Sequence, residues 1–114
     1  MTPKGKSAPT FHPCGPWLAT PDTVGDPARV RLWLDHNGTR RQDGTTADMI
    51  LNVAGIIRHL SQFMVLEPGD LINTGTPHGA GKDLNPPQYL SPGDTLTCGA
   101  DGLGSQHQTV SAAT

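Results

Sequence analysis

Glutamate is almost missing from this sequence of 114 residues: Glu67 stands alone beside nine aspartates. A site that requires two glutamates therefore cannot be assembled from this chain by itself. Aromatic residues are also scarce, at 4%, whereas there are 14 glycines and 11 prolines. This composition is typical of a loop-rich fold with short strands, and the length allows one domain at most.

Long apolar runs and clusters of basic residues are absent as well. No window approaches the roughly 18 apolar residues of a membrane span, and the segment MTPKGKSAPT at 1–10 has no signal-peptide core. The formal net charge is −2 and the eight basic residues are scattered, so we expect neither a membrane nor a nucleic-acid partner. We expect a cytoplasmic protein in which Cys14 and Cys98 are reduced thiols, with a disulfide as the alternative.

The pattern of residues divides the chain into an arm and a domain. Residues 1–28 hold six of the eleven prolines and little periodicity, which predicts an extended N-terminal arm, with 16–20 lying along a sheet edge. Residues 29–114 form the folded part. There, Val30, Leu32 and Leu34 alternate with polar or aromatic neighbours as in a strand, and Asn37-Gly38 predicts a tight hairpin that returns through 39–42.

One segment has helical periodicity, and it predicts a helix near 52–64 with Asn52 as N-cap. Its apolar stripe comprises Val53, Ile56, Ile57, Leu60 and Met64 and is expected in the core or at a subunit interface, with the first four buried together. After it, the pattern Leu-x-Pro-Gly-Asp occurs twice, at 66–70 and 90–94, and both copies suit a type II turn followed by a strand, at 71–74 and 95–98.

Asp70 and Asp94 are expected to cap these turns. A last hairpin should turn near Gly102. The predicted fold class is α+β: a mixed, mostly antiparallel sheet or roll with one main helix.

The glycine-rich stretch LEPGDLINTGTPHGAGKD, at 66–83, suggests a phosphate-binding loop at first sight. A Walker A loop, however, requires a hydroxyl residue after Gly-Lys, where this chain has Asp83. Thr76 stands where the first glycine belongs, and Pro77 removes a backbone donor. These departures exclude a nucleotide-binding loop.

Several segments together resemble the fumarylacetoacetate hydrolase family, in the C-terminal part of its catalytic domain. They occur in the family's order: KS at 6–7, TFHPCGPWLAT at 10–20, RLWLDHNGTRRQDGTT at 31–46, DMI at 48–50, LSQFMVLEPGDLINTGTPHGAG at 60–81, YLSPGDTL at 89–96 and GLG at 102–104. The chain departs from the family pattern at Pro9, where aspartate is common, and at His36 and Ala80, where valine is usual.

The resemblance implies hydrolysis, isomerisation or decarboxylation of carbon–carbon bonds in 2-oxo or β-keto acids, with Mg²⁺, or Mn²⁺ or Ca²⁺ in its place. The metal polarises the oxo and carboxylate oxygens. The family's metal ligands, a Glu-x-Glu pair and an aspartate, lie upstream of the matching segment. We therefore expect no metal site in this chain and poor binding of magnesium, unless Asp22, Asp26 or Asp83 contribute to one.

The same resemblance assigns site residues. Lys6 matches the active-site lysine, and Thr74, Gly75 and Thr76 match the loop that binds the substrate carboxylate through hydroxyl and N–H donors. His78 is a candidate substrate contact, with a solvent-facing loop histidine as the alternative. Taken without the resemblance, the loop is a structural turn and Lys6 an exposed lysine. Arg40 and Arg41 are expected at a solvated hairpin edge.

Three functions remain open at this point. The chain is part of a family enzyme whose metal ligands lie elsewhere, or an inactive family member that binds small carboxylates, or a structural domain that dimerises through its sheet and helix. An incomplete family domain leaves apolar surface uncovered, so we expect a homo-oligomer or pairing with the missing upstream segment.

Overall fold

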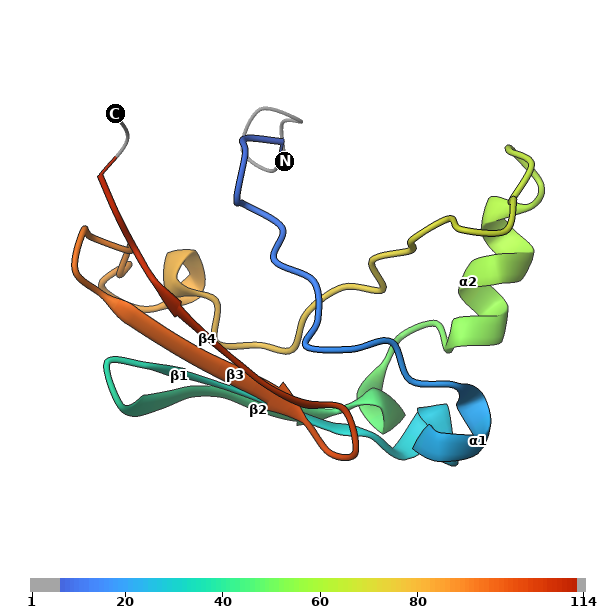
Figure 1. Cartoon of the computed structure of the whole chain (residues 1–114), viewed down its shortest axis with the longest axis horizontal. Helices are drawn as coiled ribbons and strands as arrows, with labels where there is room; N and C mark the ends of the chain where they lie inside the picture. The colour runs from blue at the N-terminus through green and yellow to red at the C-terminus, as the bar shows by residue number, and fades with distance from the viewer. Residues whose placement is uncertain (1–6, 113–114) are drawn as a thin grey trace.

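A four-stranded antiparallel sheet forms the centre of the computed structural model, which describes residues 7–112 (Figure 1). Its strands are β1 (Arg31–His36), β2 (Thr39–Thr45), β3 (Thr95–Ala100) and β4 (Gly104–Thr109), in the order β2-β1-β3-β4. Both predicted hairpins are confirmed. Asn37 and Gly38 turn the first with φ values of 49° and 75°, as a type I′ turn requires, and Gly102 lies in the second at φ 76°.

The two faces of the sheet differ in chemistry because side chains alternate along each strand. One face carries ion pairs between Arg31 and Asp43 and between Arg40 and Asp35, with Arg40 also 4.8 Å above the ring of Trp33. The opposite, inner face carries Leu32 and Leu34 of β1, together with Leu96, Cys98 and Ala100 of β3. The alternation predicted for 30–35 is confirmed.

A β-bulge interrupts the pairing of β1 with β2. Leu34 lies opposite Gln42 and Asp35 opposite Arg40, so that Arg41 is the extra residue. Such a bulge locally disrupts the ladder and redirects side chains. Here Arg41 and Gln42 both line a cavity on the inner face.

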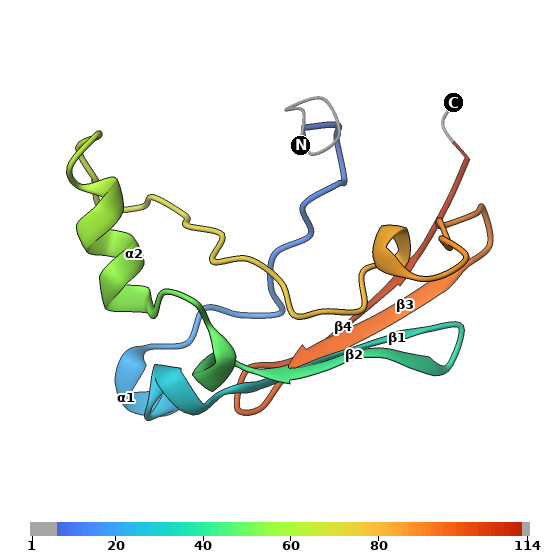
Figure 2. The ribbon, with the colours of Figure 1, turned by 180° about the vertical axis from the view of Figure 1, so that it is seen from behind.

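The N-terminal arm runs over the same side of the sheet as the connection between α2 and β3 (Figures 1 and 2). It contains α1 (Pro21–Val24) and η2 (Pro27–Arg29), a 3₁₀ turn capped by Asp26. Gln106 on the edge strand β4 donates to the carbonyl of Gly15, and Trp17 packs beside Gly104. These contacts hold the arm against the edge without adding a strand. The division at residue 28 stays a prediction.

The main helix, α2 (Val53–Leu60), follows the 3₁₀ turn η3 (Thr46–Asp48). Asn52 caps it as predicted, accepting from the Gly55 N–H at 2.8 Å, but the helix ends four residues before the predicted residue 64. Its apolar stripe is not buried within the chain: Ile57 is 45% exposed and Val53 38%. Figure 2 shows α2 standing away from the sheet. Periodicity marks a face suited to burial but cannot supply the surface that covers it.

Little of this fold is buried. Val30, at 7% exposure, is the buried hydrophobic side chain among residues 7–112. The strand predicted at 71–74 is wrong, since these residues pair with no strand, whereas the one predicted at 95–98 is confirmed as part of β3. Large apolar side chains remain exposed just before α2, at Leu51, and along the connection after it, at Phe63, Met64, Val65 and Leu71.

Candidate functional site

The loop at 74–81 crosses the inner side of the sheet with its backbone directly against β2. A Cβ on Gly79 would overlap the carbonyl oxygen of Arg41, and one on Gly44 of β2 would lie 2.9 Å from the Cβ of Pro77. Gly79 also has φ +98°, a conformation that favours glycine. Glycine at these positions is what allows loop and strand to approach so closely.

Gln42 ties the loop to β2. Its side-chain nitrogen Nε2 donates to the hydroxyl of Thr76 at 3.0 Å and to the carbonyl oxygen of Pro77 at 2.8 Å, with the His78 carbonyl at 3.4 Å. Sequence reasoning missed this residue. No signal in the sequence could have found it, because Gln42 lies opposite Leu34 only through the bulge, and the bulge is not visible in the sequence.

Two cavities border the loop on the inner side of the sheet. One, of about 380 Å³, is lined by Gly75 and Thr76 together with inner-face residues such as Leu32, Leu34 and Cys98. The other, of about 340 Å³, lies between β1, β2 and the segment that includes η4 (Gly81–Asp83). Thr76 and Gln42 line both, so these two residues lie where the two cavities meet.

The structure brings only part of the predicted site together. Gly75 and Thr76 line a cavity, and Gly75 has φ +110°. All four loop residues are exposed, and Thr74 and His78 line neither of the two cavities. Lys6, the predicted catalytic residue, lies outside the described residues. The roles of all five stay predictions.

Two histidines outside the candidate loop, His12 and His107, make structural contacts. His12 of the arm bonds to the Asn73 side chain at 3.0 Å, next to the loop, and His107 bonds to the hydroxyl of Thr97. The arm is therefore tied to the base of the candidate loop as well as to β4.

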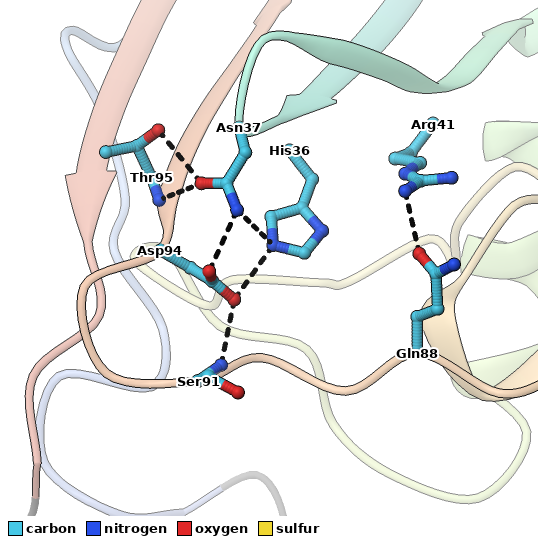
Figure 3. A network of polar contacts seen from close by, with 7 residues as sticks. All are labelled: His36, Asn37, Arg41, Gln88, Ser91, Asp94 and Thr95. Carbon is cyan, nitrogen blue, oxygen red and sulfur yellow. Dashed lines mark hydrogen bonds and ion pairs between the residues drawn. The ribbon is translucent and has the colours of Figure 1, made fainter.

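A cluster of polar side chains joins the first hairpin to the second Pro-Gly-Asp turn (Figure 3). Asp94 accepts from the Asn37 amide and the Ser91 N–H, each at 2.8 Å, and lies 2.9 Å from His36 Nε2. These bonds, the one from Asn37 foremost, lower the pKa of Asp94 to about 2. Asp94 therefore caps its turn as predicted. Through Asn37 and His36 it also ties the start of β3 to the end of β1.

The expectation that both arginines lie at a solvated hairpin edge is wrong for Arg41. Its Nη2 donates to Gln88 at 2.7 Å (Figure 3), and its Nε is a buried atom without a hydrogen-bond partner among the described residues. Strand alternation explains the error: Arg40 lies opposite Asp35 on the outer face, so the next residue, Arg41, faces the inner side, where it lines a cavity.

Residues 7–112 do not form a metal centre. Within 7–112, no group of three or more His, Cys, Asp or Glu side chains could hold an ion, and we therefore derive no step through a metal from these residues. Cys14 and Cys98 are free, and burial raises the pKa of Cys98, which keeps it a thiol at neutral pH. In the described part of the chain, no helix is long and apolar enough to cross a membrane.

Comparison with known proteins identifies the family. The family model described as fumarylacetoacetate (FAA) hydrolase, C-terminal, matches residues 1–111. This chain belongs to the fumarylacetoacetate hydrolase family. It is 50% identical to a 2,4-didehydro-3-deoxy-L-rhamnonate hydrolase from a Sphingomonas species, over 95% of this chain and 38% of that protein.

Solved structures of the family confirm the predicted fold class. A fumarylacetoacetate hydrolase from Exiguobacterium antarcticum matches with a TM-score of 0.92 and 41% identity, over 96% of this chain and 39% of that one. A maleylpyruvate hydrolase from Sphingobium, in complex with manganese and pyruvate, matches with a TM-score of 0.80 and 38% identity. The match covers 90% of this chain and 36% of that one. The chain thus spans somewhat over a third of the length of these relatives.

Proposed function

We propose that this chain forms the carboxylate-binding side of a catalytic pocket that cleaves or isomerises carbon–carbon bonds in 2-oxo or β-keto acids. The observation that carries the proposal is the position of Thr76. Thr76 lines a cavity of about 380 Å³, on a loop whose neighbour Gly75 leaves the backbone open to approach. Hydroxyl and N–H donors in such a loop suit a carboxylate.

In this proposal, Thr76 and Gly75 hold the carboxylate end of the substrate, and Lys6 adds positive charge near the reacting oxygen. The inner-face side chains Leu32 and Leu34 exclude water from one wall of the cavity. The polarising cation, Mg²⁺, Mn²⁺ or Ca²⁺, would be held by residues outside 7–112. The reaction would take place in the cytoplasm. Hydrolysis is the activity that the names of the similar proteins favour.

A second candidate is an inactive family member that binds a small carboxylate. The observation that favours it is the position of Glu67, the single glutamate of the sequence: it lies in an exposed turn and lines neither of the two cavities, so it supplies no carboxylate to them. An assay of maleylpyruvate turnover with magnesium separates the two candidates when the chain is combined with a separate upstream segment that supplies the Glu-x-Glu and aspartate ligands. Turnover by the combination supports the enzyme, whereas binding without turnover supports the inactive member.

The binding proposal is tested by titrating the chain with oxalate and following backbone amide chemical shifts. Without a bound cation we expect millimolar affinity, about −4 kcal/mol. Thr76→Val keeps the shape of the side chain and removes its hydroxyl, and should weaken binding roughly tenfold. Thr74→Val is the matched control, because Thr74 lines neither cavity. Equal affinities for wild type and both variants would contradict the proposal.

We further propose that the chain self-associates through its exposed apolar side chains. Leu18 is 95% exposed, and Ile50 and Val65 are also open to solvent near α2. Monomeric proteins rarely leave large apolar patches uncovered. Sedimentation velocity should show a dimer or larger species, reduced by Ile57→Glu. A stable monomer would instead favour pairing with a separate upstream segment.

A further inference from the structure

We propose that Gln42 is a positioning residue that makes the Thr76 hydroxyl a hydrogen-bond donor to the bound carboxylate. This inference rests on the proposed function, in which Thr76 contacts the substrate. Gln42 itself does not contact the substrate. It acts through the orientation of the Thr76 hydroxyl.

The bulge in β2 brings Gln42 to the right place. Because Arg41 is the extra residue, Gln42 lies opposite Leu34 and shares its inner face. Its side chain borders both cavities, at the point where Thr76 also borders both. Without the extra residue, the pairing of β2 would be shifted by one position, which turns a side chain to the other face of a sheet.

The contacts of the Gln42 amide define which of its atoms faces the loop. The side-chain atom within 2.8 Å of the Pro77 carbonyl oxygen also lies 3.0 Å from the Thr76 hydroxyl. A carbonyl oxygen only accepts hydrogen bonds, so the amide must present its nitrogen there. The two amide hydrogens then serve the two nearest acceptors, Pro77 and Thr76.

This arrangement decides the direction of the Thr76 proton. A hydroxyl has one hydrogen and two lone pairs, and an amide nitrogen has no lone pair that accepts a hydrogen. With one lone pair of Thr76 occupied by Gln42, the hydroxyl hydrogen must point to some other acceptor. In a cavity that holds an anion, that acceptor is the carboxylate, and the hydroxyl is oriented for it before binding.

The role of Gln42 in orienting Thr76 can be distinguished from a role in holding the loop on β2, because the loop backbone also makes close contacts of its own. Gly79 lies directly against the carbonyl of Arg41, and Gly81 against that of Gln88. Replacing Gln42 with methionine, which has a similar shape, removes the amide donor and leaves these close approaches in place. We therefore expect Gln42→Met to fold and to leave Thr76 free to rotate.

The decisive experiment is a double-mutant cycle with oxalate as ligand, using Gln42→Met, Thr76→Val and the double variant. Gln42→Met should weaken binding about threefold to tenfold, and the double variant should bind no more weakly than Thr76→Val alone. Gln88→Met is the matched control, since Gln88 bonds to Arg41 and lines only the other cavity, and its affinity should equal that of the wild type.

Each result has a defined meaning. Two outcomes overturn the role of Gln42 and leave the proposed function standing. In the first, Thr76→Val weakens binding but Gln42→Met does not. In the second, both variants weaken binding and their effects add in the double variant. No oxalate-dependent shift in the wild type overturns both. If Gln42→Met fails to fold, the side-chain amide resonances of Gln42 decide in its place. They should move on oxalate binding in the wild type and stay still in Thr76→Val, and the same response in both proteins overturns the inference.

Discussion

The two Pro-Gly-Asp turns have the same local structure in different surroundings. In each, the aspartate N–H donates to the carbonyl three residues earlier, at 3.1 Å for Asp70 and 3.0 Å for Asp94. In each, the carboxylate accepts from a backbone N–H of the turn at 2.8 Å. Asp94 alone of the two also receives hydrogen bonds from the β1–β2 hairpin within the described residues, through Asn37 and His36.

This difference in contacts accompanies a difference in the path of the chain beyond each turn. After Asp94, the Thr95 N–H donates to the Asn37 side chain and the Asn37 N–H to the Thr95 carbonyl, and the chain continues as β3. After Asp70, residues 71–74 remain outside the sheet and lead to the candidate loop. A turn sequence therefore determines a reversal of the chain, whereas a partner on a neighbouring strand determines whether the next residues join the sheet.

The largest effect should come from removing the side chain that joins the second turn to the hairpin. Asn37→Ala loses the bonds to Asp94 and Thr95 and places alanine at φ 49°. We expect a loss of about 2–3 kcal/mol in the free energy of unfolding, measured by urea denaturation. Asn73→Ala, near the first turn and bonded to His12, should cost less than about 1 kcal/mol. Equal losses would remove the distinction between the turns.

A smaller effect on stability should distinguish the two turns when the glycine of each is replaced by alanine. Gly69 and Gly93 have φ values of +100° and +95°, and a Cβ at either position meets open space. Alanine therefore causes only backbone strain, roughly 1–2 kcal/mol. Gly93→Ala should lower global stability by that amount, whereas Gly69→Ala should change only local hydrogen exchange near 66–74. A lower urea midpoint for Gly69→Ala would show that the first turn is part of the cooperative unit.

The smallest effect concerns the stability of the folded chain at acidic pH. The pKa of Asp94 is about 2 in the folded chain against 3.8 ordinarily, so its carboxylate contributes stability above pH 3.8 that is lost as the pH falls toward 2. Asp94→Asn removes this contribution. The stability difference between wild type and variant, from urea midpoints, should be constant near neutral pH and shrink between pH 3.8 and 2. A difference that stays constant through this range would contradict the lowered pKa.

Features that depend on neighbouring residues were predictable from the sequence. Asn37-Gly38 determines the hairpin because both residues tolerate positive φ, and Asn52 caps its helix through Gly55, three residues along the chain. Both aspartate caps span three residues as well. The end of the helix and the burial of Ile57 could not be predicted, because both depend on what packs against the helix.

The candidate site likewise combines residues that the sequence identified with residues that only the fold revealed. The family motif pointed to Thr74, Gly75, Thr76 and His78, yet only Gly75 and Thr76 line a cavity. The motif could not show which of the two threonines lines these cavities, because that depends on the course of the loop over β2. Arg41 was expected in solvent, because its partner Gln88 is 47 residues away in the sequence. Gln42 was not noticed, since the bulge that moves it to the inner face arises from the pairing of two strands.

The sequence by itself determined the family, the turns, the caps and the alternation of β1, since each of these depends on residues close together in the chain or on a motif read in order. The tertiary structure decided which segment after a turn became a strand and which side chain orients Thr76. Gln42 and Thr76 are 34 residues apart. Only folding brings such a pair within hydrogen-bonding distance, because the contact depends on the path of every residue between them.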